Sequence, residues 1–152
     1  DCLQNNEKYS DTITHGIKEE GCRLKLDNIR NHIIINPEQL KNPTKMCDRL
    51  VFIEGTDAII ACAVELKSGY FHVTDVRNQL QEGCKLIYRI ISDCSKSNSE
   101  LRLFPVLVHG KGLTPNEIKY LRINKVTINR KIKYDILLQK CGSNLSKTIF
   151  RY

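Results

Sequence analysis

The stretch that decides the fold covers residues 47–67 and reads CDRLVFIEGTDAIIACAVELK. Its two halves, residues 47–53 and 59–67, are rich in the β-branched and apolar side chains that strands favour. Residues 55–58 between them have the composition of a short hairpin loop. The second half is apolar on both faces until its last residues, as expected of a strand that is covered on both sides. We therefore predict two neighbouring antiparallel strands at the centre of a sheet.

The hairpin loop sets the register of these two strands. If the loop comprises residues 55–58, counting back along both strands places Asp48 directly opposite Glu65. Opposed Cβ atoms in an antiparallel pair are about 4.5–5.5 Å apart, so both carboxylates can reach one hard metal ion. A loop that is one residue longer would instead place Asp48 opposite Val64.

Glu65 and Lys67 lie two residues apart on one strand and therefore point to the same face. The preceding residues on that face, Ala61 and Ala63, are small and leave room for a site. A carboxylate at the end of an apolar strand is costly to bury unless a cation compensates its charge. A divalent metal ion and the lysine would both do so.

The other elements are expected from local composition and periodicity. They are a short helix over residues 7–20 that ends at Gly21, strands or a hairpin at 22–26 and 32–35, a long helix over 72–94 with Thr74 as N-cap, a strand at 101–109, a helix over 114–121, and strands at 126–128 and 134–138. This order indicates one α/β domain over residues 1–152: a core at about 7–110, with a central mixed sheet flanked by helices, and a C-terminal β extension at about 111–152.

The net charge of +7 is concentrated in the C-terminal extension. Residues 111–152 carry ten Lys or Arg against Glu117 and Asp135, whereas the first 110 residues are close to neutral. Such a one-sided excess favours a polyanionic partner such as nucleic acid, although ordinary solvated surface can have the same composition. The candidate phosphate-binding residues are Lys125, Arg130, Lys131 and Lys133.

The seven cysteines form an odd count and show no zinc-binding spacing. Most of them lie in apolar segments, which favours reduced thiols that serve as small core residues in a reducing cytosol. No apolar run approaches the length of a membrane span. We therefore expect a cytoplasmic protein with no membrane contact and no structural zinc.

Three short runs together resemble the PD-(D/E)XK, or restriction-endonuclease-like, nucleases. The runs are CDRL at residues 47–50, AVELKSG at 63–69 and QL at 79–80. Asp48 matches the family's metal-binding aspartate, although Cys47 replaces the proline of the family name. Residues 126–142, which end in Cys-Gly, resemble the C-terminal strand pair of small antiphage-linked members.

The resemblance implies the roles of the site residues. Glu65 would be the second carboxylate, Lys67 the lysine that positions or activates water, and Gln79 the glutamine that some subgroups carry on the following helix. Asp48, Glu65 and the backbone carbonyl of Leu66 would hold one or two Mg²⁺ or Mn²⁺ ions. The family's occasional acidic residue on the first helix would fall on either Glu19 or Glu20.

The implied activity is that of a metal-dependent endonuclease that hydrolyses phosphodiester bonds of nucleic acid, DNA in preference to RNA, and leaves 5′-phosphate and 3′-hydroxyl ends. Tyr70 and Phe71 lie where bases could stack, but core packing or a lid would also explain them. Gln79 is equally consistent with a site contact and with a satisfied core amide.

The alternative function is a noncatalytic nucleic-acid-binding or assembly module of the same fold, in a homo-oligomer or in a larger defence or repair complex. A Glu-x-Lys sequence on a strand is by itself often only a solvated ion pair. The combination of Asp48, Glu65 and Lys67 favours the nuclease, because a noncatalytic relative usually lacks at least one of these residues.

Overall fold

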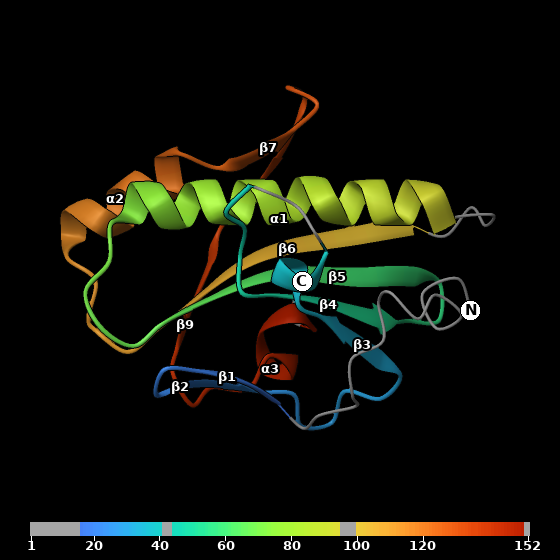
Figure 1. Ribbon diagram of the computed structural model, residues 1–152, viewed down its shortest axis with the longest axis horizontal. Coiled ribbons are helices and arrows are strands. Elements are labelled where there is room, and N and C mark those ends of the chain that lie inside the picture. Colours follow the sequence, from blue (N-terminus) through green and yellow to red (C-terminus); the bar gives the residue numbers. More distant parts are fainter. Residues whose placement is uncertain (1–15, 41–43, 95–99, 151–152) are drawn as a thin grey trace.

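A computed structural model of the chain describes residues 16–40, 44–94 and 100–150. Its centre is a five-stranded mixed sheet in the order β3-β4-β5-β6-β9 (Figure 1). The strands are β3 (His32–Ile35), β4 (Arg49–Glu54), β5 (Ala58–Lys67), β6 (Glu100–His109) and β9 (Leu137–Lys140). Neighbours are antiparallel from β3 to β5 and parallel from β5 to β9. The prediction of an α/β fold with a mixed sheet is confirmed.

The β4–β5 hairpin has the register that the sequence predicts. Glu54 pairs with Ile59, and the pairing continues in step as far as Arg49 and Val64. The backbone N–H of Gly55 donates to the carbonyl of Ala58 at 2.9 Å and closes the loop. A side chain on Gly55 would come within 2.7 Å of that same carbonyl oxygen, so the tight loop requires glycine. The next position in this register places Asp48 beside Glu65.

Helix α1 (Val73–Cys94) covers one face of the sheet and carries the chain from β5 to the parallel strand β6 (Figure 1). The long helix is confirmed, but its first turn is closed by the carbonyl of His72, which accepts from Asp75 and Val76. Thr74 therefore lies inside the first turn and is not the N-cap. Gly83 is the point where the helix approaches the sheet closely, because a Cβ there would clash with the Cys47 Sγ atom.

The opposite face of the sheet is covered by a small second layer (Figure 1). This layer contains the hairpin of β1 (Gly16–Glu19) and β2 (Cys22–Lys25) together with helix α3 (Ser146–Ile149). Ile17, Leu24, Leu145 and Ile149 from these elements are buried in one cluster with Val51 and other residues of the sheet. The sheet therefore has a core on each side, which explains why β5 is apolar on both faces.

The helix predicted over residues 7–20 is wrong for its described part, where residues 16–19 form β1. Glu20 and Gly21 both have positive φ, of 35° and 83°, and make the tight turn into β2. Tertiary contact overrides the helical spacing because Ile17 pairs with Leu24 and faces the core. The remainder of the predicted helix lies outside the described residues.

The strands predicted at 22–26 and 32–35 are confirmed as β2 and β3, but they do not form a hairpin with each other. Strand β2 pairs with β1 in a separate two-stranded sheet, whereas β3 pairs with β4. The connection between them includes Asn28 and Asn31, which both adopt positive φ. It carries the chain from the second layer to the edge of the central sheet.

The C-terminal extension is joined to the core more closely than its sequence suggests. Helix α2 (Pro115–Ile123) begins with a capping box in which Thr114 and Glu117 exchange hydrogen bonds. Strands β7 (Val126–Ile128) and β8 (Ile132–Tyr134) pair with each other, and β9 then enters the central sheet beside β6. The strand predicted at 134–138 is thus divided between the end of β8 and the start of β9. The short 3₁₀ helix η2 (Pro37–Gln39) follows β3.

The prediction that all cysteines are reduced is wrong. Cys22 and Cys141 form a disulfide although 119 residues separate them, and Cys94 is also disulfide-bonded. Cys47, Cys62 and Cys84 are free and buried, as expected of core thiols. Disulfides persist in oxidising environments, so the cysteines give no support for a reducing cytosol. In the described part of the chain, no helix has the length and apolar character needed to cross a membrane.

Candidate active site

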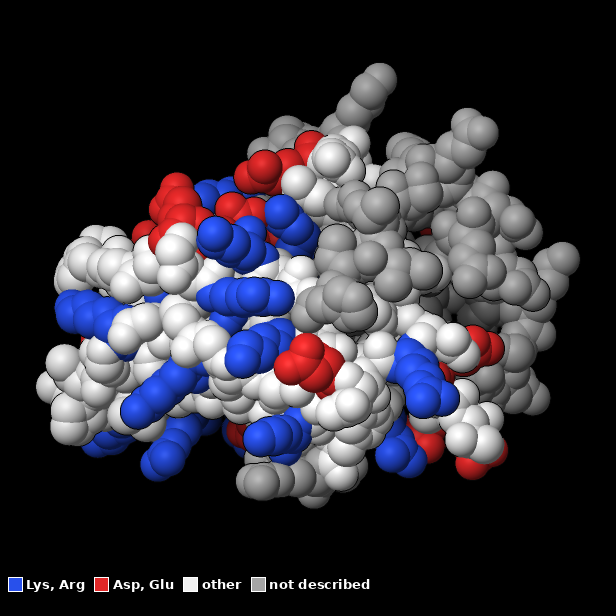
Figure 2. All heavy atoms as spheres, turned by 90° about the horizontal axis from the view of Figure 1, so that it is seen from below, with Lys and Arg blue, Asp and Glu red and all other residues white. Residues whose placement is uncertain are grey.

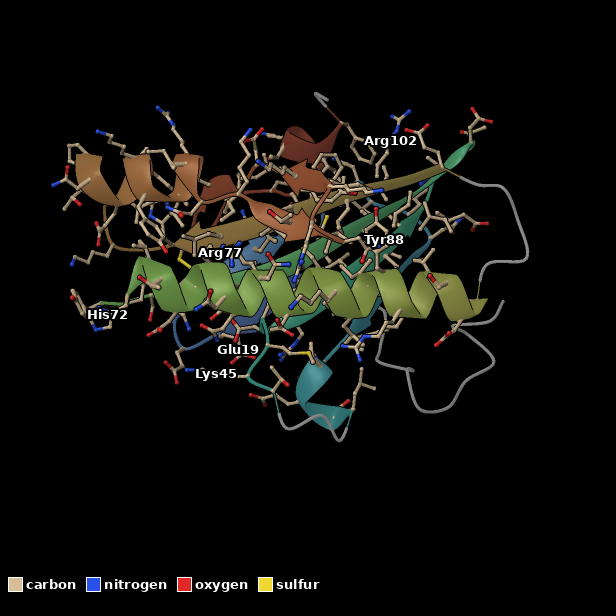
Figure 3. The ribbon with its side chains drawn as sticks, turned by 90° about the horizontal axis from the view of Figure 1, so that it is seen from above. Glu19, Lys45, His72, Arg77, Tyr88 and Arg102 are labelled. Carbon is tan, nitrogen blue, oxygen red and sulfur yellow. A yellow bond between two sulfur atoms is a disulfide. The ribbon has the colours of Figure 1, made fainter. Side chains whose placement is uncertain are left out.

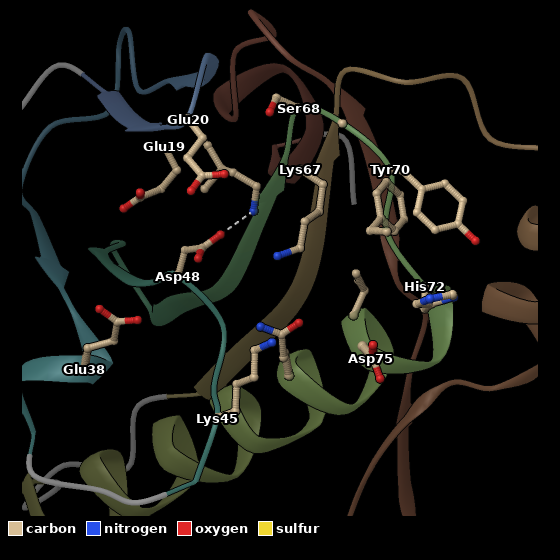
Figure 4. Close-up of a pocket in the computed structure, with 15 residues that line it drawn as sticks. Glu19, Glu20, Glu38, Lys45, Asp48, Lys67, Ser68, Tyr70, His72 and Asp75 are labelled. Carbon is tan, nitrogen blue, oxygen red and sulfur yellow. Dashed lines mark hydrogen bonds between the residues drawn. The ribbon is translucent and has the colours of Figure 1, made fainter.

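A cleft of about 510 Å³ opens where β5 ends and α1 begins (Figure 4). The start of β4, the β1–β2 turn and η2 supply its other walls. Of the predicted site residues, Asp48, Leu66, Lys67 and Gln79 line this cleft, and Glu65 is buried beside them. The fold therefore brings the predicted core of the site together.

Asp48 and Glu65 are held side by side by reciprocal hydrogen bonds. The backbone N–H of Asp48 donates to the Glu65 Oε2 atom at 3.1 Å. In return, the Asp48 Oδ2 atom accepts from the backbone N–H of Leu66 at 2.7 Å, the contact that is dashed in Figure 4. These bonds continue the hairpin register past the last strand pair, so the predicted proximity of the two carboxylates is confirmed.

Lys67 supplies the positive charge next to this pair. Its Nζ atom lies 2.6 Å from the Glu65 Oε1 atom, and 28% of its side chain is exposed toward the cleft, whereas Glu65 has no exposed surface. Among the described residues, Oε1 has no hydrogen-bond partner besides this ammonium group. Glu65 is thus a buried carboxylate whose charge is only partly compensated by its protein neighbours.

The pKa values of the three groups reflect this arrangement. Burial, followed by the neighbouring Asp48 charge, raises the pKa of Glu65 to about 7 against the opposing effect of Lys67. Burial also raises the pKa of Asp48, despite the Leu66 N–H bond and the Lys67 charge. Burial lowers the pKa of Lys67, but the Glu65 hydrogen bond and the two carboxylate charges outweigh it and raise this pKa overall. The site therefore favours additional positive charge.

Gln79 is a buried, hydrogen-bonded amide that also lines the cleft. It is only 6% exposed, and its Nε2 atom donates to the carbonyl of Met46 at 3.3 Å. Met46 lies two residues before Asp48, so this bond fixes the segment that presents the carboxylate.

Three glutamates form an acidic wall on the Asp48 side of the cleft, opposite Lys67 (Figure 4). Glu19 and Glu20 come from the β1–β2 turn and Glu38 from η2. The Glu19 Oε1 atom makes an ion pair with the Arg49 guanidinium at 2.7 Å, whereas Glu20 acts on the site by raising the pKa of Lys67. Sequence analysis does not identify Glu38 as a cleft residue, nor Lys45 and Asp75, because only the folded chain brings them there.

Tyr70 and Phe71 have different positions at the rim of the cleft. The Tyr70 side chain is 71% exposed, whereas Phe71 packs against the core. The Tyr70 ring lies edge-on to His72 with 5.2 Å between centroids, and the Lys111 Nζ atom lies 4.5 Å from the centre of the tyrosine ring. Both aromatic residues line the cleft, but Tyr70 is the more exposed of the two.

The predicted phosphate-binding residues are not brought to the cleft. Lys125, Arg130, Lys131 and Lys133 belong to the β7–β8 hairpin and its approach, which packs on α1 (Figure 1). Thr127 of this hairpin exchanges two hydrogen bonds with the amide of Gln81, at 2.6 and 2.9 Å. Residues two apart lie on nearly opposite sides of a helix, so the hairpin contacts α1 on the side away from Gln79 and the cleft.

The described residues contain no group of three or more His, Cys, Asp or Glu side chains arranged to hold a metal ion. The carboxylates available at the centre of the cleft are the pair Asp48 and Glu65. Protein ligands at such a site would therefore be two carboxylates and backbone oxygen, with water completing the coordination shell.

Comparisons with known proteins give no further identification. No family model matches the chain, and neither the curated proteins nor the solved structures include a match.

Proposed function

We propose that this chain is a metal-dependent nuclease of the PD-(D/E)XK type that hydrolyses phosphodiester bonds of nucleic acid, DNA in preference to RNA. One observation carries the proposal: Glu65, without exposed surface, contacts Asp48 and Lys67 at an open cleft. Burying a second carboxylate beside the first is costly, and a bound cation would compensate the negative charge of the pair.

The order of the elements supports a restriction-endonuclease-like core. Strands β3, β4 and β5 form an antiparallel meander, α1 crosses over, and β6 lies parallel to β5. Asp48 precedes β4, and Glu65 and Lys67 end β5. The meander, crossover helix and parallel strand match the order that the sequence resemblance implies. The first helix that it also implies is replaced, in the described residues, by the β1–β2 hairpin, which carries Glu19 and Glu20.

Asp48, Glu65 and the Leu66 carbonyl would hold Mg²⁺ or Mn²⁺. Hard cations take oxygen ligands, and Mg²⁺ is commonly held by one or two carboxylates with several waters retained. The buried Glu65 Oε1 atom, which contacts no hydrogen-bond donor other than Lys67 in the described part of the chain, fits this role. A bound metal ion would polarise the scissile phosphate and lower the pKa of a water molecule.

The chain's own residues would position the reaction. Lys67 reaches the cleft from beside Glu65, so its ammonium group can orient the attacking water and stabilise negative charge that develops on the phosphate. Gln79 would act as a positioning residue, because it fixes the segment before Asp48 through the carbonyl of Met46.

The acidic wall makes metal and substrate binding interdependent. Glu19, Glu20 and Glu38 face Lys67 across the cleft and would repel a phosphate. Metal ions must reduce this repulsion before a phosphodiester can approach. The proposal therefore predicts that nucleic acid enters the cleft only when the metal is present.

A cleavage assay tests the proposal. Labelled duplex DNA, single-stranded DNA and RNA are incubated with the protein in Mg²⁺, Mn²⁺ or EDTA, beside Lys67→Ala and the matched control Lys85→Ala. Lys85 is an exposed lysine on α1 that pairs with Glu82, so its loss leaves the cleft intact. We expect cutting that needs metal and Lys67 but not Lys85. If the folded protein cuts none of the substrates, the noncatalytic module becomes the better explanation.

A further inference from the structure

The β1–β2 hairpin presents basic side chains on its outer face. Ile17 and Leu24 pair with each other and are buried toward the sheet. On the other side of the hairpin, Lys18 lies directly opposite Arg23, and Lys25 lies opposite a glycine. All three basic residues are exposed. The hairpin thus separates an apolar inner face from a cationic outer one.

Two more lysines extend this face. Lys140 ends β9 and Lys147 lies in α3, and both are exposed. We call Lys18, Arg23, Lys25, Lys140 and Lys147 the basic face. Figure 2 views the molecule from this side and shows Lys and Arg side chains gathered over it, with a group of acidic side chains at its upper edge.

The positive charges of the basic face are not neutralised within the described part of the chain. None of its five residues takes part in an ion pair there. Like charges directly opposite each other on paired strands are destabilising, as for Lys18 and Arg23. By contrast, Lys125 near the β7–β8 hairpin lies 2.9 Å from Asp135. The basic face retains charge at a cost in stability, which is expected of a surface that binds an anion.

The backbone beneath the basic face is rigidly connected. The Cys22–Cys141 disulfide joins β2 to the chain that follows β9. The carbonyl of Arg23 accepts from Gly142 at 2.6 Å, and the N–H of Lys25 donates to Ser143 at 2.8 Å. These links fix the backbone positions from which the cations of separate elements project, so the backbone does not have to become ordered on binding.

A shallow polar hollow lies between Lys25 and Lys147. Gln139 and Thr148 line it and carry amide and hydroxyl groups of the kind that contact phosphate and sugar. The Ser143 hydroxyl is buried, and the Asn144 side chain is already hydrogen-bonded to Asp27 and Ser146. Asp27 also lines the hollow and accepts a hydrogen bond from Asn144 at 3.4 Å. The hollow thus combines two cations with a few neutral polar groups and one carboxylate.

We propose that the basic face binds the phosphate backbone of the nucleic acid substrate outside the cleft. This inference rests on the proposed function. It assigns binding of the substrate's phosphate backbone to a surface other than the β7–β8 hairpin. The β1–β2 hairpin connects the two regions, because its turn lines the cleft while its outer face carries the cations. The acidic cleft cannot itself attract a polyanion, so attraction has to come from neighbouring surface.

Fluorescence anisotropy with labelled duplex DNA tests this proposal, in EDTA so that no cleavage occurs. The test variant is Lys18→Gln/Arg23→Gln/Lys25→Gln, and the matched control is Arg130→Gln/Lys131→Gln/Lys133→Gln, which removes the same charge from exposed positions of the β7–β8 hairpin. Circular dichroism verifies that both variants fold. The test variant removes like-charge repulsion and is not expected to lose stability.

We expect the slope of log Kobs against log salt to become shallower by roughly 2 to 3 in the test variant, because each lost phosphate contact contributes about 0.9. The control should retain the wild-type slope. If the slope became equally shallow in both variants, the cause would be net charge and the proposal would be overturned. A shallower slope in the control alone, or an unchanged slope in the test variant, would also overturn it. Binding of a sulfated polysaccharide through the basic face without binding of DNA would overturn the choice of partner.

The assay separates this inference from the nuclease proposal. If wild-type protein cuts DNA with Mg²⁺ while the test variant keeps its salt slope, the binding role of the basic face is refuted and the nuclease proposal is supported. If the test variant loses DNA binding but no substrate is cut by the wild-type protein, the binding surface stands without the nuclease.

Discussion

Replacement of Glu65 by glutamine should stabilise the metal-free protein at alkaline pH. The pKa of this carboxyl rises from 4.5 to about 7 in the folded state, chiefly through burial. The folded state therefore binds the proton more tightly than the unfolded state. The free energy of unfolding should fall as pH rises from about 4.5 to about 7 and then level off. At about 1.4 kcal/mol per pKa unit, ionised Glu65 costs roughly 3 kcal/mol above this range.

The opposing effect of Lys67 is already contained in the pKa of about 7. Because the Glu65 carboxylate lies beside an open cleft and a partly exposed lysine, solvent screens its charge, and we discount the gain to about 2 kcal/mol at pH 8. At pH 4.5, where the carboxyl of Glu65 is protonated in the folded state and about half protonated in the unfolded state, the variant should gain little. The difference between the two pH values isolates the cost of the buried charge.

Urea unfolding in EDTA, followed by circular dichroism at pH 4.5 and pH 8, measures this difference, and an unchanged m-value shows that the denatured state is comparable. Glu38→Gln is the matched control because Glu38 is an exposed carboxylate of the same cleft, and its effect should stay within about 0.5 kcal/mol. A variant at Glu65 that is less stable than wild type at pH 8, or equally stabilised at both pH values, would refute the reasoning.

Three further predictions follow from named contacts. Gly83→Ala should lower the free energy of unfolding by about 1–3 kcal/mol in urea, because its Cβ would clash with Cys47; an unchanged stability would mean that the helix can move away from the sheet at little cost. Cys141→Ser should lower it by roughly 3–5 kcal/mol, because the Cys22 disulfide closes a long loop, and a variant as stable as oxidised wild type would contradict this in the same assay. Mg²⁺ should raise the melting temperature of wild type but not of Asp48→Asn, and an equal rise in both would exclude the carboxylate pair as the metal site.

The parts of the fold that sequence analysis predicted are those in which local pattern and tertiary structure agree. The β4–β5 hairpin follows from a short loop between two apolar segments, and its register brings Asp48 beside Glu65 without any distant information. The helix after β5 follows from its regular apolar spacing. The central pair of carboxylates was predictable because a single hairpin contains both.

The features that sequence analysis missed depend on contacts between distant segments. Strand β1 follows a helical spacing locally, but burial of Ile17 against the sheet selects the hairpin. The Cys22–Cys141 disulfide joins segments whose proximity exists only after β9 enters the sheet. The basic face was missed for the same reason, since it combines two elements from the N-terminal part of the chain with two from the C-terminal part. Summed charge along the sequence pointed instead to β7–β8.

Cleavage of end-labelled duplex DNA at pH 8 by wild type and Glu65→Gln, with Mg²⁺ or EDTA, tests the central claim most directly. The account predicts Mg²⁺-dependent products with 5′-phosphate and 3′-hydroxyl ends for wild type, and none for the variant, although the variant is folded and more stable without metal. Cutting that persists in Glu65→Gln or in EDTA would contradict the assignment of Asp48, Glu65 and Lys67 as a metal-dependent catalytic centre.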